Sequence, residues 1–138
     1  MSGDQVSRGL VDTNIVVHLP ALDPSHLPDE MVISAVTLAE LSAAPHHAGD
    51  AAERARRMSV LQHVEATFDP LPFDTEAARA YGLVSAAVLE VGRKPRRRVA
   101  DLMIASVAIA HRLPLYTTNP DDFTGLNDLV TVVSVKRP

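Results

Sequence analysis

Four acidic residues, far apart in the chain, each lie next to an expected junction between a strand and a helix or turn: Asp12, Glu40, Asp101 and Asp122. In an α/β fold such junctions converge, because the carboxyl ends of parallel strands open onto one edge of the sheet. Hard carboxylate oxygens are the ligands that Mg2+ and Mn2+ prefer, and such a site suits metal-assisted hydrolysis of phosphodiester bonds. The four residues therefore predict a divalent-metal site with hydrolytic chemistry.

Three of these residues also have a purely structural interpretation. Asp12 could cap the helix that follows it, since Asp is a good N-cap residue. Glu40 lies three residues after Thr37, which is the spacing of a capping box. Asp122 belongs to an Asn-Pro-Asp-Asp turn, where acidic side chains often accept hydrogen bonds from nearby backbone amides. Each residue alone is weak evidence for a metal.

Asp101 is more informative, because it begins a segment, residues 102–110, that carries no charge on any face. That pattern is typical of a helix buried in a core. A carboxylate at the end of such a helix is costly to desolvate, and the helix N-terminus compensates only part of that cost. The rest could come from a bound cation, which we favour, or from an ion pair with Arg97 or Arg98.

Composition limits the class of protein and the type of ligand. With 138 residues, 46% of them hydrophobic and 22% charged, the chain is expected to form a single globular domain, residues 1–138. No apolar stretch approaches the ~20 residues of a membrane span and no signal peptide is apparent, so we expect a cytoplasmic protein. The chain has no Cys, so a metal must be held by oxygen or imidazole. The six His lack metal-ligand spacing and are expected to be structural or solvated.

One segment is strongly basic although the net charge is −4. Five of the 13 basic residues fall at positions 93–98, directly before Asp101. Contacts from Arg and Lys to phosphates dominate affinity for nucleic acid without reading sequence. We expect this segment, and Arg96, Arg97 and Arg98 in particular, to contact phosphates of a nucleic acid; a solvated loop, or contact with an acidic partner protein, is the alternative.

The order of the expected elements defines the fold class. Strands are predicted at residues 9–11, 31–34, 115–117 and 130–135, with a short edge strand in 68–73. Helices are predicted at residues 14–19, 37–44, 51–66, about 75–91 and 99–112. Strands that alternate with helices imply an α/β fold with a mostly parallel central sheet flanked by helices on both faces.

Taken together, these residues resemble a known family, the PIN-domain ribonucleases, and within it the VapC toxins of bacterial type II toxin–antitoxin systems. The resemblance rests on four segments in order: Leu10-Val11-Asp12-Thr13-Asn14, Thr37-Leu38-Ala39-Glu40-Leu41, Ala100-Asp101-Leu102-Met103-Ile104-Ala105 and Leu115 to Phe123. It implies a PIN-like fold with Asp12, Glu40 and Asp101 as the acidic residues of a metal site. Many PIN domains carry an acidic residue where this chain has Asn119, so the fourth carboxylate is either Asp122 or missing.

The resemblance also implies an activity and partners. We expect endonucleolytic hydrolysis of RNA that depends on Mg2+, with Mn2+ as a substitute. The residues expected to contact the RNA are Arg96, Arg97, Arg98 and Asn119. Asp12 and Asp101 would ligate the metal most directly, while Glu40 and Asp122 would complete the shell or orient the attacking water. The family further implies a homodimer and a cognate antitoxin protein.

Two other classes of protein remain to be weighed. A receiver-like phosphoacceptor domain also gathers Asp residues at strand ends, but it needs a Lys near a late strand, and the only lysines are Lys94 and Lys136. A catalytically inert PIN-like module that binds RNA or protein would keep the fold without needing the carboxylates. The presence of Asp12, Glu40 and Asp101 disfavours the inert module.

Overall fold

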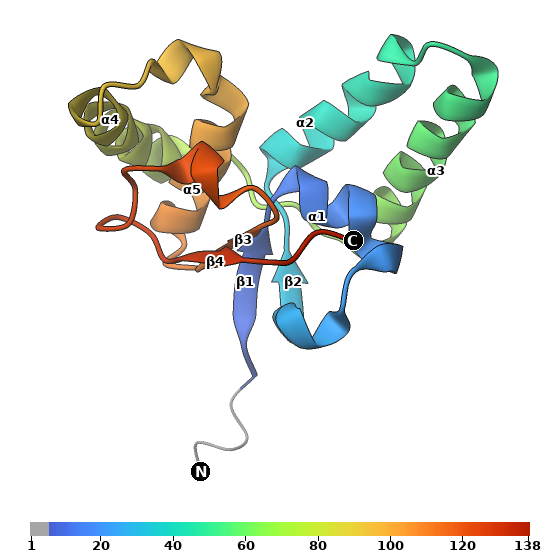
Figure 1. Cartoon of the computed structure of the whole chain (residues 1–138), viewed down its shortest axis with the longest axis horizontal. Helices are drawn as coiled ribbons and strands as arrows, with labels where there is room; N and C mark the ends of the chain where they lie inside the picture. The colour runs from blue at the N-terminus through green and yellow to red at the C-terminus, as the bar shows by residue number, and fades with distance from the viewer. Residues whose placement is uncertain (1–5) are drawn as a thin grey trace.

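A four-stranded, wholly parallel sheet forms the centre of the computed structural model, which describes residues 6–138 (Figure 1). The strands are β1 (Arg8–Val11), β2 (Glu30–Val32), β3 (Leu115–Thr117) and β4 (Val132–Ser134). Their order across the sheet is β2-β1-β3-β4. The chain therefore leaves β1 toward one side for β2 and later returns to its other side for β3. The carboxyl ends of β1 and β3 form a topological switch point, where α/β proteins commonly bind ligands.

Five α-helices accompany the sheet in the described part of the chain. They are α1 (Thr13–His18), α2 (Ala35–Ala43), α3 (Ala51–Thr67), α4 (Thr75–Glu90) and α5 (Val99–Ala110). Aspartate side chains accept backbone N–H groups at the start of α1, α3 and α4, as good N-cap residues should. The predicted fold class and the five helices are confirmed.

The start of α2 differs from the prediction. Its N-cap is Ser34, whose hydroxyl oxygen accepts the backbone N–H of Val36 at 2.8 Å, and Thr37 lies inside the helix. The capping-box interpretation of Glu40 is therefore wrong, because Thr37 is not a cap. Ser34 was assigned to the preceding strand, and an extended cap residue continues a strand without a break in the sequence pattern.

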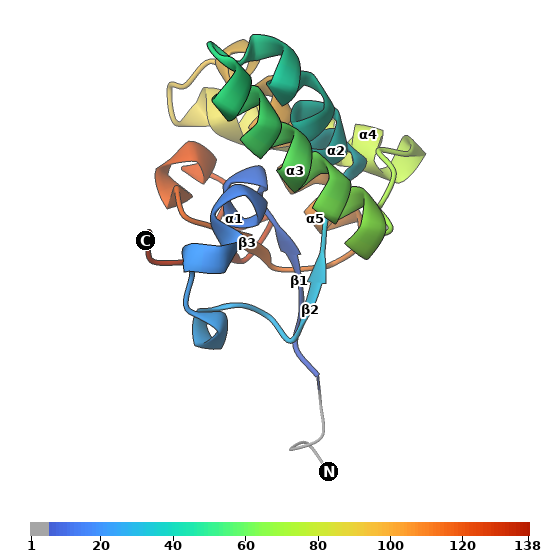
Figure 2. The ribbon, with the colours of Figure 1, turned by 90° about the vertical axis from the view of Figure 1, so that its right-hand side faces the viewer.

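The two faces of the sheet bury different helices because successive strand residues point to opposite sides. Leu10 packs in one core cluster with residues of α4 and α5, while its neighbour Val11 packs in another with residues of α1, α2 and α3. Figures 1 and 2 show these two groups of helices on either side of the strands. The predicted charge-free segment of α5 is buried, including Leu102, Ile104 and Val107. Both faces of the sheet are covered, as predicted.

Short irregular segments complete the fold. The predicted edge strand in residues 68–73 is reduced to a single parallel bridge between Leu71 and Ser34. In β1, Gly9 is required by close packing, because a Cβ there would overlap the ring of Tyr116 on β3. Within residues 6–138, no helix is long and apolar enough to cross a membrane.

Candidate functional site

Asp12 directly follows β1 at the switch point, where it is the N-cap residue of α1, and it is only 3% exposed. Its Oδ1 accepts the backbone N–H of Thr13 at 2.8 Å, so the capping interpretation is confirmed. Its Oδ2 accepts two further hydrogen bonds, from the Thr117 hydroxyl at 2.9 Å and from Asn14 Nδ2 at 3.1 Å. A cap needs only the first of these contacts. The other two hold the carboxylate in one orientation at the edge of the sheet.

The partners of Asp12 are themselves joined across the switch point. Thr117, at the end of β3, also accepts the backbone N–H of Asn119 at 3.0 Å, and Asn14 Oδ1 accepts the backbone N–H of Thr118 at 3.2 Å. The loop after β3 is thus tied to the start of α1. Sequence reasoning missed Thr117 as a site residue, because only the pairing of β1 with β3 brings it to Asp12.

Glu40 reaches the same edge from the middle of α2. Its Oε1 accepts the hydroxyl of Thr13 at 2.6 Å, and Thr37 Oγ1 lies 3.0 Å from that hydroxyl. Since the proton of Thr13 goes to Glu40, Thr37 donates to Thr13. The carboxylate is partly buried, and two threonines fix its approach to the site.

Asp101 lies in the first turn of α5 and is partly buried. Burial raises the pKa of this carboxyl group to about 7, and the nearby charges of Asp12, Asp122 and Glu40 add to the rise. The charge of Arg98 opposes it without an ion pair between the two side chains. No hydrogen bond from any residue in 6–138 reaches the Asp101 carboxylate. The alternative to a bound cation, a direct ion pair of Asp101 with Arg97 or Arg98, is therefore not observed.

Asp122 lies in a 3-10 turn, Pro120–Phe123, after β3, and it forms the ion pair with Arg98 that was the alternative considered for Asp101. Arg98 Nη1 donates to Asp122 Oδ1, and both side chains are about one third exposed (34% and 29%). Arg93 Nη1 donates to the backbone carbonyl of Asp121 at 2.6 Å. Two arginines of the basic segment are thus engaged with the loop after β3.

The remaining basic residues of this segment are directed to solvent. Lys94, Arg96 and Arg97 are exposed, and none of them pairs with a carboxylate within residues 6–138. They surround a short 3-10 turn, Pro95–Arg97, that leads into α5. The basic segment therefore has two parts. Arg93 and Arg98 contact the loop after β3, whereas Lys94, Arg96 and Arg97 are exposed and available to a ligand.

The four predicted carboxylates act on one another electrostatically. Burial raises the pKa of Asp12; hydrogen bonds from Thr117 and Thr13 lower it, and the charges of Glu40 and Asp122 raise it again. The desolvated carboxylates repel one another, so the site has an excess of negative charge. Arg98 compensates only part of that excess. The structure therefore brings Asp12, Glu40, Asp101 and Asp122 to one edge of the sheet.

The carboxylates do not yet form a coordination shell. Among residues 6–138, no three acidic or histidine side chains approach closely enough to hold one ion. Two of the carboxylates have partners outside the cluster, since Glu40 accepts a hydrogen bond from Thr13 and Asp122 accepts one from Arg98. The donor set, oxygens alone with incompletely compensated negative charge, fits a hard divalent cation, and the carboxylates would have to move closer together to hold one.

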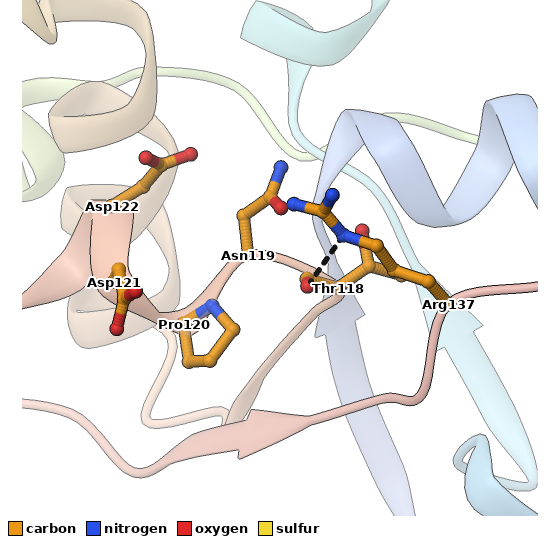
Figure 3. Close-up of a pocket in the computed structure, with 6 residues that line it drawn as sticks. All are labelled: Thr118, Asn119, Pro120, Asp121, Asp122 and Arg137. Atoms are coloured by element: carbon orange, nitrogen blue, oxygen red, sulfur yellow. Dashed lines mark hydrogen bonds between the residues drawn. The ribbon is translucent and has the colours of Figure 1, made fainter.

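A pocket of about 360 Å3 adjoins this edge (Figure 3). Its lining residues are Thr118, Asn119, Pro120, Asp121, Asp122 and Arg137. The Oδ1 atom of Asn119 is buried and has no hydrogen-bond donor within the described chain. A second, more apolar pocket of about 720 Å3 lies among α1, α2 and α3 and includes none of the four carboxylates.

Comparison with known proteins gives consistent matches. The PIN domain family matches residues 9–128. Ribonuclease VapC5 of Mycobacterium tuberculosis (strain ATCC 25618 / H37Rv) is 34% identical over 133 residues, which cover 94% of this chain and 96% of that protein. Ribonuclease VapC of Rickettsia bellii (strain RML369-C) is 29% identical over 126 residues, 87% of this chain and 91% of that protein.

A solved structure also matches. It is the crystal structure of VapBC-5 from Mycobacterium tuberculosis, a member of the VapBC family of toxin–antitoxin systems. The TM-score is 0.81 at 34% sequence identity, and the match covers 95% of this chain and 99% of that chain.

Proposed function

Because the chain belongs to the PIN-domain family, among its VapC-type ribonucleases, we propose that it is a metal-dependent endoribonuclease that hydrolyses RNA phosphodiester bonds. The observation that carries the proposal is the convergence of four carboxylates at the switch point, with the pKa values of Asp12 and Asp101 both raised. Such desolvated, mutually repelling carboxylates are stabilised by a cation. The ionisation state of this cluster therefore depends on what binds there.

We assign Mg2+ as the cofactor, with Mn2+ as a substitute, from the oxygen-only donor set. Asp12 and Asp101 would hold the ion most directly, and Glu40 and Asp122 would complete the shell or orient water. When bound, the ion would supply charge stabilisation for the attacking and leaving oxygens. The chain offers no His or Cys in this cluster to replace that contribution.

The residues around the carboxylates have supporting roles. Thr117 and Asn14 keep Asp12 in one orientation, and Thr13 keeps Glu40 beside α1. Arg98 holds Asp122 by an ion pair, so the fourth carboxylate becomes available to the site when that pair opens. Such partners of metal-binding carboxylates typically contribute 10–100-fold to metal affinity or activity.

The relatives suggest the partners. VapBC-5 belongs to a toxin–antitoxin system, and by analogy this chain is the toxin of such a pair with its own antitoxin protein. A homodimer is part of the proposal as well. Leu83 and Leu89 of α4 and Val99 of α5 are exposed apolar residues, which would suit burial against a second copy.

A second candidate function is a catalytically inert PIN-like module that binds RNA or protein. The observation in its favour is that no three carboxylates within residues 6–138 are close enough to hold one ion in this conformation. Both candidates share the fold, so only metal-dependent chemistry separates them.

The test is cleavage of RNA by the purified chain with Mg2+, with excess EDTA, and in the Asp12→Asn variant. The ribonuclease proposal predicts internal cuts with Mg2+ only, and none in the variant. Cutting that persists both in EDTA and in Asp12→Asn would show that another group, or a contaminant, is responsible. RNA binding without any cutting under all metal conditions would favour the inert module.

A further inference from the structure

Arg137 is the cation that sequence analysis did not connect to the site. It follows β4, which pairs in parallel with β3 in the register Thr117 to Ser134. The backbone N–H of Val135 continues this pairing by donating to the carbonyl of Thr117 at 2.8 Å. The segment after β4 is therefore carried to the same edge of the sheet as the loop after β3. Arg137 Nε then donates weakly to the carbonyl of Thr118 at 3.4 Å.

The guanidinium of Arg137 is only partly used by the protein. The bond from Nε fixes the side chain against the loop, but its two terminal nitrogens find no acceptor within residues 6–138. Asp121 and Asp122 line the same pocket, yet neither forms an ion pair with Arg137. A guanidinium has five N–H donors in a planar fork. Most of these donors remain free for a ligand.

The pocket has two chemically different ends. Figure 3 shows Asp121 and Asp122 at one end, and Arg137 beside Thr118 and Asn119 at the other. The charge of Asp122 is offset by Arg98. The buried Oδ1 of Asn119 also lacks a donor, but it is an acceptor, so any attraction of this end for an anion comes from Arg137. An anion would be repelled at the acidic end and attracted at the end formed by Arg137.

We propose that the Arg137 end of this pocket binds a phosphate group of the RNA backbone, next to the phosphate that is cut at the carboxylate cluster. This inference rests on the proposed ribonuclease function. Arg is suited to such contacts because its fork matches two phosphate oxygens at once. The contact positions the strand and carries no sequence information. Arg137 thus supplies a positive charge for RNA beside the acidic site, in a chain whose net charge is −4.

The test measures RNA affinity in an Asp12→Asn background, in which the bound strand is not cut. The probe is a fluorescein-labelled single-stranded RNA of mixed sequence, titrated at several salt concentrations. Arg137→Gln should weaken binding severalfold and flatten the slope of log affinity against log salt by about 0.7, the value for one lost contact to a single strand. Lys136→Gln removes the same charge from the neighbouring exposed residue and should leave the slope nearly unchanged.

Two further arms identify the role of the side chain. Arg137→Lys keeps the charge, so it should retain the salt slope while losing part of the affinity that depends on the fork. If Arg137→Gln lowers the melting temperature and leaves the slope unchanged, the residue only braces the Thr118 carbonyl and the inference is wrong. If inorganic phosphate stabilises the parent protein but not Arg137→Gln, while RNA binding is unaffected, the pocket holds free phosphate and the RNA role is rejected.

The failure of this inference is distinct from the failure of the ribonuclease proposal. If the parent protein binds RNA and Arg137→Gln binds it with the same affinity and slope, only the role of Arg137 is overturned. If the wild-type chain neither binds nor cuts RNA, the ribonuclease proposal falls, and the role of Arg137 falls with it.

Discussion

Thr117 donates its hydroxyl hydrogen to Oδ2 of Asp12 at 2.9 Å, and this bond joins the ends of adjacent strands β3 and β1. Both residues are buried, at 0% and 3% exposure. The bond lowers the pKa of Asp12 against the larger effect of burial, which raises it. Thr117 therefore helps to keep a buried carboxylate charged and oriented at the point where the strand order reverses.

Replacing Thr117 by Val should test this relationship. The variant keeps the shape of the side chain and removes the hydroxyl, so Asp12 loses one donor and the N–H of Asn119 loses its acceptor. We expect a loss of about 1–3 kcal/mol in the free energy of unfolding, measured by denaturant titration, and weaker Mn2+ binding. Thr118→Val is the matched control, because the Thr118 hydroxyl makes no hydrogen bond within residues 6–138. Equal losses in both variants would mean that the hydroxyl of Thr117 has no special role.

The raised pKa of Asp101 predicts how metal-free stability depends on pH. Its pKa is about 7 in the folded chain and 3.8 in the reference state, so the folded state binds the proton more tightly. The stabilising contribution of protonation is complete below pH 3.8 and is lost as pH rises through about 7. In EDTA, Asp101→Asn should raise the melting temperature near neutral pH and remove this part of the pH dependence.

Thermal melts in EDTA across that pH range check the prediction. Asp128→Asn is a control, since Asp128 is exposed and does not belong to the cluster of four carboxylates. If the melting temperature of Asp101→Asn follows the wild-type pH profile, Asp101 does not experience the proposed desolvation and repulsion.

Glu40 offers a way to separate a structural role from a role in metal binding. Glu40→Gln keeps an oxygen that can accept the hydroxyl of Thr13, so metal-free stability should be maintained or slightly raised. The stabilisation gained on adding Mn2+ should be strongly reduced. Thr13→Val should instead lose about 1 kcal/mol without metal, because its hydroxyl bonds to both Glu40 and Thr37 are removed. Melts with and without Mn2+ distinguish these outcomes. A full Mn2+ response in Glu40→Gln would remove Glu40 from the proposed site.

The basic segment should divide into two functional groups. Arg96→Gln and Arg97→Gln remove exposed charges, so they should leave stability unchanged and flatten the salt dependence of RNA affinity by about 0.7 per lost contact. Arg98→Gln breaks the pair with Asp122 and should cost about 1 kcal/mol of stability. RNA titrations and denaturant melts on the three variants make the comparison. If Arg96→Gln and Arg97→Gln leave the salt slope unchanged, the exposed arginines do not contact RNA.

The sequence predicted the fold class, because each long helix and each strand has a clear local pattern. The charge-free segment of α5 is one such signal, and it is buried as predicted. Local pattern also placed Asp12 at the end of β1. It failed at Ser34, where a helix cap with extended backbone continues the preceding strand.

Contacts between distant segments were beyond sequence reasoning. The bond from Thr117 to Asp12 requires the pairing of β1 with β3, and the position of Arg137 requires the pairing of β3 with β4. An ion pair between Arg98 and Asp101 was the alternative that their closeness in the chain suggests. The structure pairs Arg98 with Asp122 instead, because the loop after β3 returns to the start of α5.

The most direct test of the account is a calorimetric titration with Mn2+ at a pH above 7, where Asp101 is ionised. The central claim is that carboxylates from the residue after β1, from α2, from α5 and from the loop after β3 act as one metal site. It predicts binding heat for the wild type that is largely lost in Asp12→Asn and in Asp101→Asn, while both variants remain folded. Heat in the wild type that does not exceed that of the two variants would contradict the claim.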